Sequence, residues 1–250
     1  MTKREKNNLF GLLGKNISYS FSKGYFTEKF KKLKLDNHQY LNFDISNIQE
    51  FKNVKQQELL KGLNVTIPYK QEVIQYLDAL DNTAKKIGAV NTIKFFEDGI
   101  LKGFNTDAYG FKYSLKPLLK KHHNSALILG TGGASKAVAF VLESLEIHYL
   151  LVSRNSKNKD VITYDSLTEE IIENHKIIIN CTPLGTSPKI ELCPDIPYHF
   201  LSDNHLLFDL IYNPSISKFL SKGLEKGATI KNGLEMLELQ AEESWRIWNS

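Results

Sequence analysis

The sequence predicts an α/β fold with mostly parallel strands, divided into two domains. Strand-length apolar runs alternate with helix-length amphipathic segments along the whole chain, and one apolar strand runs through a glycine-rich turn directly into a helix. A hairpin pattern near the middle of the chain is followed by a new series of strands and helices. The division between the two domains is therefore expected near Asn105 or Thr106.

The first domain is expected to alternate strands with helices and to end in a hairpin. Apolar runs bounded by turn residues predict strands, and apolar residues at helical spacing predict helices. Asp98 and Gly99 supply a turn, so residues 89–107 are expected to fold as two antiparallel strands. The other expected strands are 8–14, 39–45 and 62–68, and the expected helices are 25–33, 48–57 and 70–80.

The second domain is expected to open with a helix over residues 108–119, followed by a polar break at 120–125. Its strands and helices then alternate as they do in parallel sheets with crossover helices. The expected strands are 126–130, 147–154, 176–180 and 205–212, and the expected helices are 132–146, 166–174, 217–227 and 234–249.

Composition narrows the classes of function. Hydrophobic residues make up 42% of the chain and charged residues 24%, as in ordinary globular proteins. The net charge of +4 is too small, and its residues too evenly spread, to predict nucleic-acid binding, although it suits an anionic ligand. Apolar runs do not exceed strand length, so no membrane span is expected.

The two cysteines, Cys181 and Cys193, match no metal-binding or redox spacing. We expect two reduced thiols, no metal site and a cytoplasmic protein.

The clearest cofactor signal is the turn after the strand 126–130. Glycines in such a turn let the backbone approach a pyrophosphate, and the following helix offers free N–H groups and a positive dipole end. The G-x-G-G-A spacing differs from the common G-x-G-x-x-G, and glycine in a strand-to-helix turn can serve geometry alone. Because the flanking strand and helix both fit, we predict a dinucleotide site at Gly130, Thr131, Gly132, Gly133 and Ala134.

The end of the next strand indicates which dinucleotide binds. An NAD site would carry an acidic residue there, about 20 residues after the glycines, to hold the ribose 2′-hydroxyl. This chain has Ser153, Arg154 and Asn155, with Lys157 nearby, and no acid before Asp160. A guanidinium with hydroxyl and amide neighbours suits a 2′-phosphate. The alternative is a solvated basic loop, but the pattern favours NADP.

Polar residues also gather in the first domain, at the end of an apolar strand. In the stretch NVTIPYK, Asn64 and Thr66 alternate with apolar residues and are followed by Lys70. Such an arrangement is typical of a site that grips a polyhydroxylated ligand. Taken alone, a lysine just after a strand is more often a solvated surface residue.

Four more polar residues complete this group. Ser20 and Ser22 are two residues apart in a loop and can present both hydroxyls to one side, where they could hold a carboxylate. Asn91 lies near the start of the predicted hairpin and Asp107 at its end. An Asn-Thr-Asp turn alone usually caps a helix, but the joint occurrence of all these residues favours a binding site.

These motifs together resemble the shikimate dehydrogenase family. The matching stretches cover nearly the whole chain and follow the family's order and approximate spacing. They are SYSFS, NVTIPYK, GAVNT, FNTDAYG, GTGGAS, NCTPLG, DLIYNP and NGLEMLELQAEESW.

The resemblance implies a two-domain architecture with the active site in the cleft between the domains. Residues 1–106 plus 232–250 would form the substrate-binding and catalytic domain, and residues 107–231 a Rossmann-like NADP-binding domain. The expected activity is the NADPH-dependent reversible reduction of 3-dehydroshikimate to shikimate, a CH–OH oxidoreductase step in chorismate and aromatic amino-acid biosynthesis. The expected partner is this small-molecule substrate alone, with no nucleic acid or membrane, in a monomer or homodimer.

The resemblance also implies residue roles. Lys70 would act with Asp107 in catalysis, with the lysine as proton donor to the ketone oxygen and as a positive charge that stabilises it. Ser20 and Ser22 would bind the substrate carboxylate. Asn64, Thr66, Asn91, Asp107 and Gln240 would hold ring hydroxyls, with Tyr212 near the substrate; Gly130 to Ala134, Ser153 to Asn155, Lys157, Asn158, Leu210 and Gly233 would contact NADP.

The chain departs from the family pattern in three places, and one role has an open alternative. Lys23 follows Ser22 where proline is common, Ser153 and Asn155 flank Arg154 in place of Asn and Thr, and Glu235 stands where a small residue is common. Gln240 faces the apolar side of its helix, so its amide could instead make a packing or backbone contact.

Three rival functions share this layout. A quinate/shikimate dehydrogenase would accept quinate and often NAD, which the basic Arg154 loop and the serine pair disfavour. A non-catalytic NADP sensor would be expected to have lost Lys70 or Asp107, and both are present. A folate-type methylene dehydrogenase has less use for the paired serines.

Overall fold

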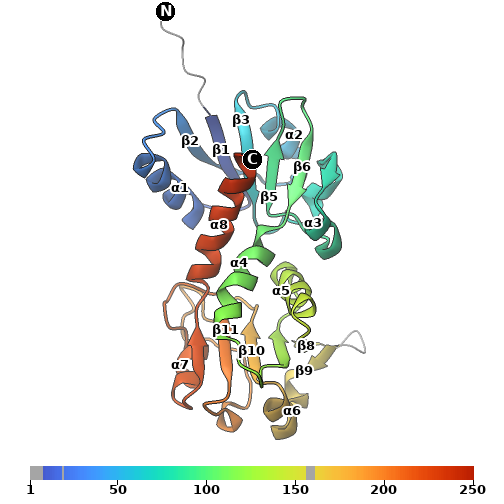
Figure 1. Cartoon of the computed structure of the whole chain (residues 1–250), viewed down its shortest axis with the longest axis vertical. Helices are drawn as coiled ribbons and strands as arrows, with labels where there is room; N and C mark the ends of the chain where they lie inside the picture. The colour runs from blue at the N-terminus through green and yellow to red at the C-terminus, as the bar shows by residue number, and fades with distance from the viewer. Residues whose placement is uncertain (1–7, 19, 156–160) are drawn as a thin grey trace, which may run out of the picture. The chain divides into compact units, whose positions relative to one another are not determined.

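The computed structural model describes residues 8–18, 20–155 and 161–250. Two units divide the chain: the first runs to Thr106 and includes Ala241–Ser250, and the second is Asp107–Gln240 (Figure 1). Each unit contains one six-stranded sheet within the described residues. The predicted α/β fold with mostly parallel strands in two units is confirmed. The last helix is divided between the two units: residues 234–240 belong to the second unit, and residues 241–248 belong to the first.

The sheet of the first unit has the order β2-β1-β3-β5-β6-β4. The β1–β2, β1–β3 and β4–β6 pairs are parallel, whereas β3–β5 and the predicted hairpin β5–β6 are antiparallel. Its strands are β1 (Asn8–Gly14), β2 (His38–Asp44), β3 (Leu60–Val65), β4 (Ala79–Leu80), β5 (Thr92–Phe95) and β6 (Leu101–Phe104).

Short helices connect these strands. The helix α3 shows the local chemistry that starts and ends them: Asp81 accepts hydrogen bonds from the backbone of Thr83 and Ala84, and Gly88 ends the helix in the left-handed conformation with φ of 69°. The helices of this unit are α1 (Phe21–Lys32), η1 (Ile48–Glu50), α2 (Phe51–Val54), η2 (Glu72–Tyr76) and α3 (Asn82–Ile87).

The prediction of one helix over residues 70–80 is wrong. The structure has the 3-10 helix η2, and then the strand β4, which pairs with β6 through Ala79–Lys102 and Leu80–Gly103. The backbones of Asp78 and Leu101 also bond at 3.0 Å. Pairing with the free edge of β6 outweighs the local helical spacing, and tertiary contacts commonly override such a weak local preference.

Both faces of the first sheet are buried. Successive residues of a strand point to opposite faces, so Leu13 of β1 joins a cluster with Phe51 and Ile93, whereas Phe10 joins a second cluster with Phe26. The second cluster also holds Trp248, at the end of the last helix. Burial on both faces explains why the central parallel strands β1 and β3 of this sheet read as continuous apolar runs.

Gly62 of β3 is required for this packing. A Cβ atom on Gly62 would lie 2.2 Å from Nε1 of Trp248, so only glycine lets the indole lie against the strand. The indole N–H then donates to the carbonyl oxygen of Ile93 at 3.0 Å. This anchors the C-terminal part of α8 in the core of the first unit.

The sheet of the second unit has the order β12-β11-β10-β7-β8-β9, and all of its pairs are parallel. Its strands are β7 (Ser125–Leu129), β8 (His148–Ser153), β9 (Val161–Thr163), β10 (Ile177–Asn180), β11 (Leu206–Asp209) and β12 (Thr229–Lys231). The two outer strands, β9 and β12, were not predicted.

The remaining helices belong to the second unit or join it to the first. They are α4 (Thr106–Leu115), η3 (Lys116–Leu118), α5 (Gly133–Ser144), η4 (Tyr164–Ser166), α6 (Glu169–Asn174), η5 (Tyr198–Phe200), α7 (Lys218–Leu224) and α8 (Leu234–Trp248). None of the helices in the described ranges combines the length and the apolar character needed to cross a bilayer.

Candidate functional site

The stretch from Asn64 to Lys70 is held firmly at the carboxyl end of β3. The backbone N–H of Thr66 donates to Leu13 at 2.9 Å, and the backbone N–H of Val90 donates to the carbonyl oxygen of Lys70 at 2.7 Å. The hydroxyl of Tyr69 donates to the carbonyl oxygen of Ile45 at 2.8 Å. These bonds fix the backbone of Lys70 next to the Val90–Asn91 segment. Lys70 itself is half-buried.

Asn64 lies inside the first unit, with 4% of its surface exposed. Its Oδ1 accepts from the hydroxyl of Tyr40 at 2.8 Å, and its Nδ2 lies 2.9 Å from Oγ of Ser244 and 3.2 Å from Oγ1 of Thr92. The carbonyl oxygen of Asn91, 3.4 Å from Nδ2, fixes which end of the amide is the nitrogen, because a carbonyl can only accept. Both N–H groups of Asn64 therefore have acceptors inside the unit, which leaves the second lone pair of Oδ1 for a ligand.

The side chain of Asn91 forms hydrogen bonds with both the backbone and the side chain of Thr106. The Oδ1 of Asn91 accepts from the backbone N–H of Thr106 at 2.6 Å, and its Nδ2 donates to Oγ1 of Thr106 at 3.0 Å. Both residues are buried. Because α4 begins at Thr106, Asn91 fixes the start of the helix whose second residue is Asp107.

The predicted serine pair lies at the N-terminus of α1. Ser20 is the N-cap residue, and its Oγ accepts from the backbone N–H of Ser22 at 3.2 Å. The side chain of Ser22 is bonded to Tyr40, the residue that orients Asn64. The start of a helix offers free N–H groups and a positive dipole end, which suits a carboxylate.

Burial raises the pKa of Tyr40 well above its usual range, against a smaller opposing effect of the Ser22 hydrogen bond. Tyr40 therefore stays a neutral hydroxyl that donates to Asn64. The serine pair and Asn64 are thus connected through one buried phenol.

The glycine-rich turn of the second unit has the geometry expected for a dinucleotide site. Gly130 has φ of 101°, which favours glycine, and a Cβ atom there would lie 3.1 Å from Cγ2 of Thr182. Cβ atoms at Gly132 and Gly133 would meet no atom within 4 Å, so open space adjoins both residues. α5 begins at Gly133, and its first N–H groups border this space.

A cavity of about 330 Å³ lies against this turn. Ser153, the last residue of β8, and Arg154, which follows it, line the same cavity. The structure therefore brings together the glycine turn and the residues predicted to bind the 2′-phosphate. The lining residues are Gly130, Thr131, Gly132, Ser153, Arg154, Tyr164, Cys181, Thr182, Pro183 and Leu184.

Other predicted cofactor residues lie near this cavity or cannot be placed. Gly133 and Ala134 form the first turn of α5, and Asn155 follows Arg154, but none of the three lines the cavity. Lys157 and Asn158 lie outside the described residues.

Sequence reasoning gave no role to Tyr164 or to the segment Cys181–Leu184. This segment follows β10, which pairs with β7, and the backbone N–H of Cys181 donates to Leu129 at 2.9 Å. The signal was available, because ligands of parallel sheets bind beyond the carboxyl ends of adjacent strands. Burial raises the pKa of the Cys181 thiol, and the nearby Asp209 carboxylate raises it further, so this cysteine is not a reactive thiolate.

Leu210 and Gly233, both predicted to lie beside the nicotinamide, are neighbours in the second unit. The backbone N–H of Gly233 donates to Ile211 at 3.0 Å, and a Cβ atom on Gly233 would lie 2.2 Å from the carbonyl oxygen of Leu210. Only glycine permits this approach. Tyr212, half-buried, follows in the same loop.

The side chain of Asp209 fixes the start of the loop that contains Leu210 and Tyr212. It is fully buried, and its carboxylate accepts from the backbone N–H of Ile211, from Nδ2 of Asn180 (both at 3.0 Å) and from the hydroxyl of Ser217. Burial raises the pKa of Asp209 to about 6, although these three hydrogen bonds oppose the shift. Asn180 in turn accepts from Thr182, which lines the cavity.

Two predicted substrate residues lie on the helices that join the units. Asp107 is half-buried in the first turn of α4. Gln240 of α8 is 7% exposed, and its Nε2 donates to the carbonyl oxygen of Leu237 at 2.9 Å. The backbone contact considered for Gln240 is therefore present.

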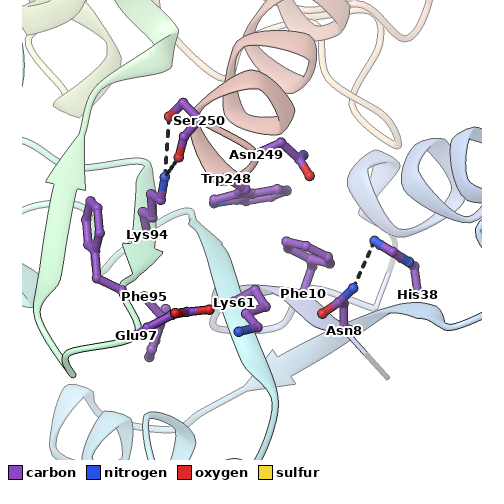
Figure 2. A pocket seen from close by; sticks show the side chains of 11 residues that line it. Asn8, Phe10, His38, Lys61, Lys94, Phe95, Glu97, Trp248, Asn249 and Ser250 are labelled. Carbon is purple, nitrogen blue, oxygen red and sulfur yellow. Dashed lines mark hydrogen bonds between the residues drawn. The ribbon is translucent and has the colours of Figure 1, made fainter. Parts of the chain in front are cut away.

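A second cavity, of about 360 Å³, lies in the first unit and holds none of the predicted site residues. Figure 2 shows two bonded pairs among its polar groups: Lys94 donates to Ser250, and Asn8 pairs with His38 at 3.3 Å. The ring centroids of Phe10 and Trp248 lie 5.0 Å apart, and the two ring planes are tilted by 34°. Because none of the predicted site residues lines this cavity, we do not assign the substrate to it. Among the described residues, no cluster of histidine, cysteine and carboxylate side chains could hold a metal ion.

Comparison with known proteins gives the family. Residues 12–93 match the shikimate dehydrogenase substrate-binding domain. A Clostridium beijerinckii shikimate dehydrogenase (NADP+) is 40% identical over 248 residues, covering 96% of this chain and 91% of the relative. The chain belongs to the shikimate dehydrogenase family.

Solved structures of family members match the full fold. The crystal structure of Aquifex aeolicus shikimate dehydrogenase has a TM-score of 0.87 and 35% identity, covering 100% of this chain and 94% of that one. A shikimate dehydrogenase solved in complex with NADP+ has a TM-score of 0.85 and 31% identity, covering 97% and 90%. The predicted membership of the shikimate dehydrogenase family is confirmed.

Proposed function

We propose that this protein is an NADP-dependent shikimate dehydrogenase, which reversibly reduces 3-dehydroshikimate to shikimate on the route to chorismate and the aromatic amino acids. The observation that carries the proposal is family membership over nearly the whole chain, with relatives named as NADP-dependent shikimate dehydrogenases. Lys70 and Asp107, on which the chemistry would depend, are both present.

The second unit fits NADP. The open space at Gly132 and Gly133, the N-terminus of α5 and the adjoining cavity suit a pyrophosphate, and Arg154 in the cavity wall suits a 2′-phosphate. Leu210 and Gly233 would lie beside the nicotinamide, with Ser153, Asn155, Lys157 and Asn158 around the phosphate. When bound, NADPH supplies the hydride.

We assign proton transfer to Lys70. Hydride addition to a ketone leaves a negative oxygen that needs a proton, and a positioned ammonium both donates that proton and stabilises the charge. The bonds that fix residues 66–70 would hold Lys70 for this step. The carboxylate of Asp107 would orient the ammonium and accept a hydrogen bond from a ring hydroxyl. In the oxidative direction the neutral amine would take the proton.

We assign substrate binding to the first unit. Ser20 and Ser22, at the N-terminus of α1, would bind the carboxylate, and Thr66 and Asn91 would hold ring hydroxyls. Gln240 and Tyr212 would complete the contacts. Asn64 would reach a ring hydroxyl through Oδ1, because both of its N–H groups have internal acceptors. In this proposal, residues 1–106 plus 232–250 serve the substrate and residues 107–231 serve NADP; a cytoplasmic location and a monomeric or homodimeric state stay predictions.

The first test is a nicotinamide absorbance assay with four mixtures: shikimate or quinate, each with NADP+ or NAD+. Fast reduction only with shikimate and NADP+ is expected. Comparable turnover with quinate or NAD+ would move the protein to a quinate/shikimate dehydrogenase. No reduction in any mixture, from folded protein that binds NADP+, would contradict the proposed activity and leave a non-catalytic NADP sensor.

A further inference from the structure

Three buried hydroxyl groups from three different elements meet inside the first unit. Thr92 belongs to β5, Thr106 begins α4, and Ser244 lies in α8. Their oxygens are 2.8 Å (Thr92–Ser244), 3.1 Å (Thr106–Ser244) and 3.2 Å (Thr92–Thr106) apart. Their residues are 0%, 1% and 0% exposed, respectively. We call these three residues the hydroxyl triangle.

The triangle touches both buried amides of the proposed substrate site. Asn64 directs Nδ2 to Ser244 at 2.9 Å and to Thr92 at 3.2 Å. Asn91 directs Nδ2 to the hydroxyl of Thr106 at 3.0 Å and accepts from the Thr106 backbone N–H at 2.6 Å. Each amide therefore takes its orientation partly from a member of the triangle.

Ser244 is the member that closes this arrangement. A serine hydroxyl offers one donor and two acceptor positions, and the polar partners of Ser244 include Asn64, Thr92 and Thr106. Ser244 lies within the last matching stretch, NGLEMLELQAEESW, but the sequence presents it only as one polar position in an amphipathic helix and gave it no role.

We propose that Ser244 is a positioning residue for the substrate face of the first unit. The inference rests on the proposed function. Through Asn64 and Thr106, Ser244 sets the direction of the Asn64 amide and the start of α4, from which Asp107 projects. Ser244 also lies one turn after Gln240 on α8, so the same hydroxyl sets the axial position of the helix that carries Gln240.

The alternative is a hydroxyl that serves folding alone, and the local partners distinguish the two roles. Without the Ser244 hydroxyl, Nδ2 of Asn64 retains Thr92 and the carbonyl oxygen of Asn91 as acceptors at 3.2 and 3.4 Å. No polar group of Asn64 is left unpaired, so the melting temperature should change little. One of the contacts that direct the Asn64 amide and Thr106 is lost, however, and catalysis depends steeply on such alignment.

The test compares buried serines in matched substitutions. Ser244→Ala should lower kcat/KM for shikimate between about 10- and 100-fold, chiefly through KM for shikimate, with KM for NADP+ unchanged. Ser114→Ala is the control, because Ser114 is 1% exposed and its hydroxyl donates to the carbonyl oxygen of Phe111 within α4. It should leave both constants unchanged. Wild-type values after Ser244→Ala, or an equal loss after Ser114→Ala, would overturn the proposal.

A second pair of variants keeps the proposal testable if Ser244→Ala does not fold. Thr92→Val removes a triangle hydroxyl and keeps the shape of the side chain, whereas Thr92→Ser keeps the hydroxyl. Thr92→Val should reproduce the rise in KM for shikimate and Thr92→Ser should not. Equal impairment of both variants would show that packing, and not the hydroxyl, is what matters.

A measurement independent of turnover separates this inference from the proposed function. The backbone N–H of Thr106 is bonded to Asn91, so its hydrogen exchange reports the start of α4 directly. Exchange at Thr106 should be faster in Ser244→Ala than in wild type and unchanged in Ser114→Ala. A wild-type protein inactive on shikimate would reject the proposed function alone, and unchanged exchange at Thr106 would reject the role of Ser244.

Discussion

The two units fix the loops at the ends of their strands with different chemistry. Each must fix loops at the carboxyl ends of its parallel strands, and each does so with a buried polar network. In the first unit the network is neutral: the hydroxyl triangle with Asn64 and Asn91. In the second unit Asn180 and Ser217 surround the carboxyl group of Asp209. A neutral network is insensitive to pH, whereas one centred on a carboxyl group is not.

The comparison also separates the proposed tasks. The neutral network lies beside the residues proposed to bind and protonate the substrate, and the ionisable one beside the cofactor cavity. If this separation is correct, substitutions in the first unit should change substrate kinetics and spare NADP binding. Substitutions at the cofactor cavity should do the reverse.

The largest effect is expected from Lys70→Ala. Loss of the proton donor should lower turnover by roughly 10²–10⁴-fold, with KM for shikimate within a few-fold and Kd for NADP+ unchanged. Steady-state kinetics and NADP+ titration measure both quantities. Lys86→Ala, an exposed lysine of α3, is the control and should behave as wild type. An unchanged turnover number in Lys70→Ala would remove Lys70 from the mechanism.

The next effect is on stability and tests the ionisable network. The pKa of Asp209, raised by burial from 3.8 to about 6, means that the folded state holds this proton more tightly than the unfolded state. Asp209 therefore stabilises the protein least above its folded pKa. Relative to Asp209→Asn, the free energy of unfolding of wild type should fall by about 3 kcal/mol in total as pH rises from well below 3.8 to well above 6, with about 2 kcal/mol of this fall between pH 4 and pH 6.

Urea unfolding at a series of pH values measures this difference. Ser244→Ala serves as the contrast, because the hydroxyl triangle contains no group that ionises in this range. Its unfolding free energy should parallel that of wild type across the same pH range. Parallel curves for wild type and Asp209→Asn would instead show that the two networks do not differ in this way.

Arg154→Ala tests the cofactor side. Removing a guanidinium from a phosphate should weaken NADP+ binding about 10- to 100-fold and change NAD+ binding only a few-fold. Fluorescence titration with each dinucleotide measures both. Arg246→Ala, in which the lost partner is Glu243 on the exposed face of α8, is the matched control. Equal losses for NADP+ and NAD+ would reduce Arg154 to a general structural role.

The smallest effect is expected from Ser20→Ala. Loss of the N-cap of α1 should cost about 1 kcal/mol of stability and also raise KM for shikimate. Thr168→Ala removes the N-cap of α6 in the second unit and should show the stability loss without the change in KM. If both variants leave KM unchanged, Ser20 caps the helix and does not bind the carboxylate.

The sequence was sufficient to predict those elements whose determining interactions are local. The strand–glycine–helix pattern around Gly130 predicted a turn that the structure confirms, and the Asp98-Gly99 turn predicted the β5–β6 hairpin. It was insufficient for the elements that form only through contacts with distant segments of the chain. β4 forms only because the edge of β6 is available, and β9 and β12 are three-residue strands at sheet edges.

The candidate site divides in the same way. Motif spacing was enough to predict that the glycine turn and Arg154 face one cavity. The partners of Asn64 and Thr92 could not be predicted, because Ser244 reaches Thr92 from 152 positions away and looks like any polar residue of a surface helix. Only the folded chain shows that this position of α8 is buried.

The docking of Trp248 against Gly62 gives the protein a built-in optical reporter. The chain has two tryptophans, Trp245 and Trp248, and both belong to the first unit. Tryptophan emission therefore follows the unfolding of that unit alone, whereas circular dichroism follows both. A difference between the two transition midpoints would measure how strongly the two halves of the enzyme depend on each other for stability, without any added label.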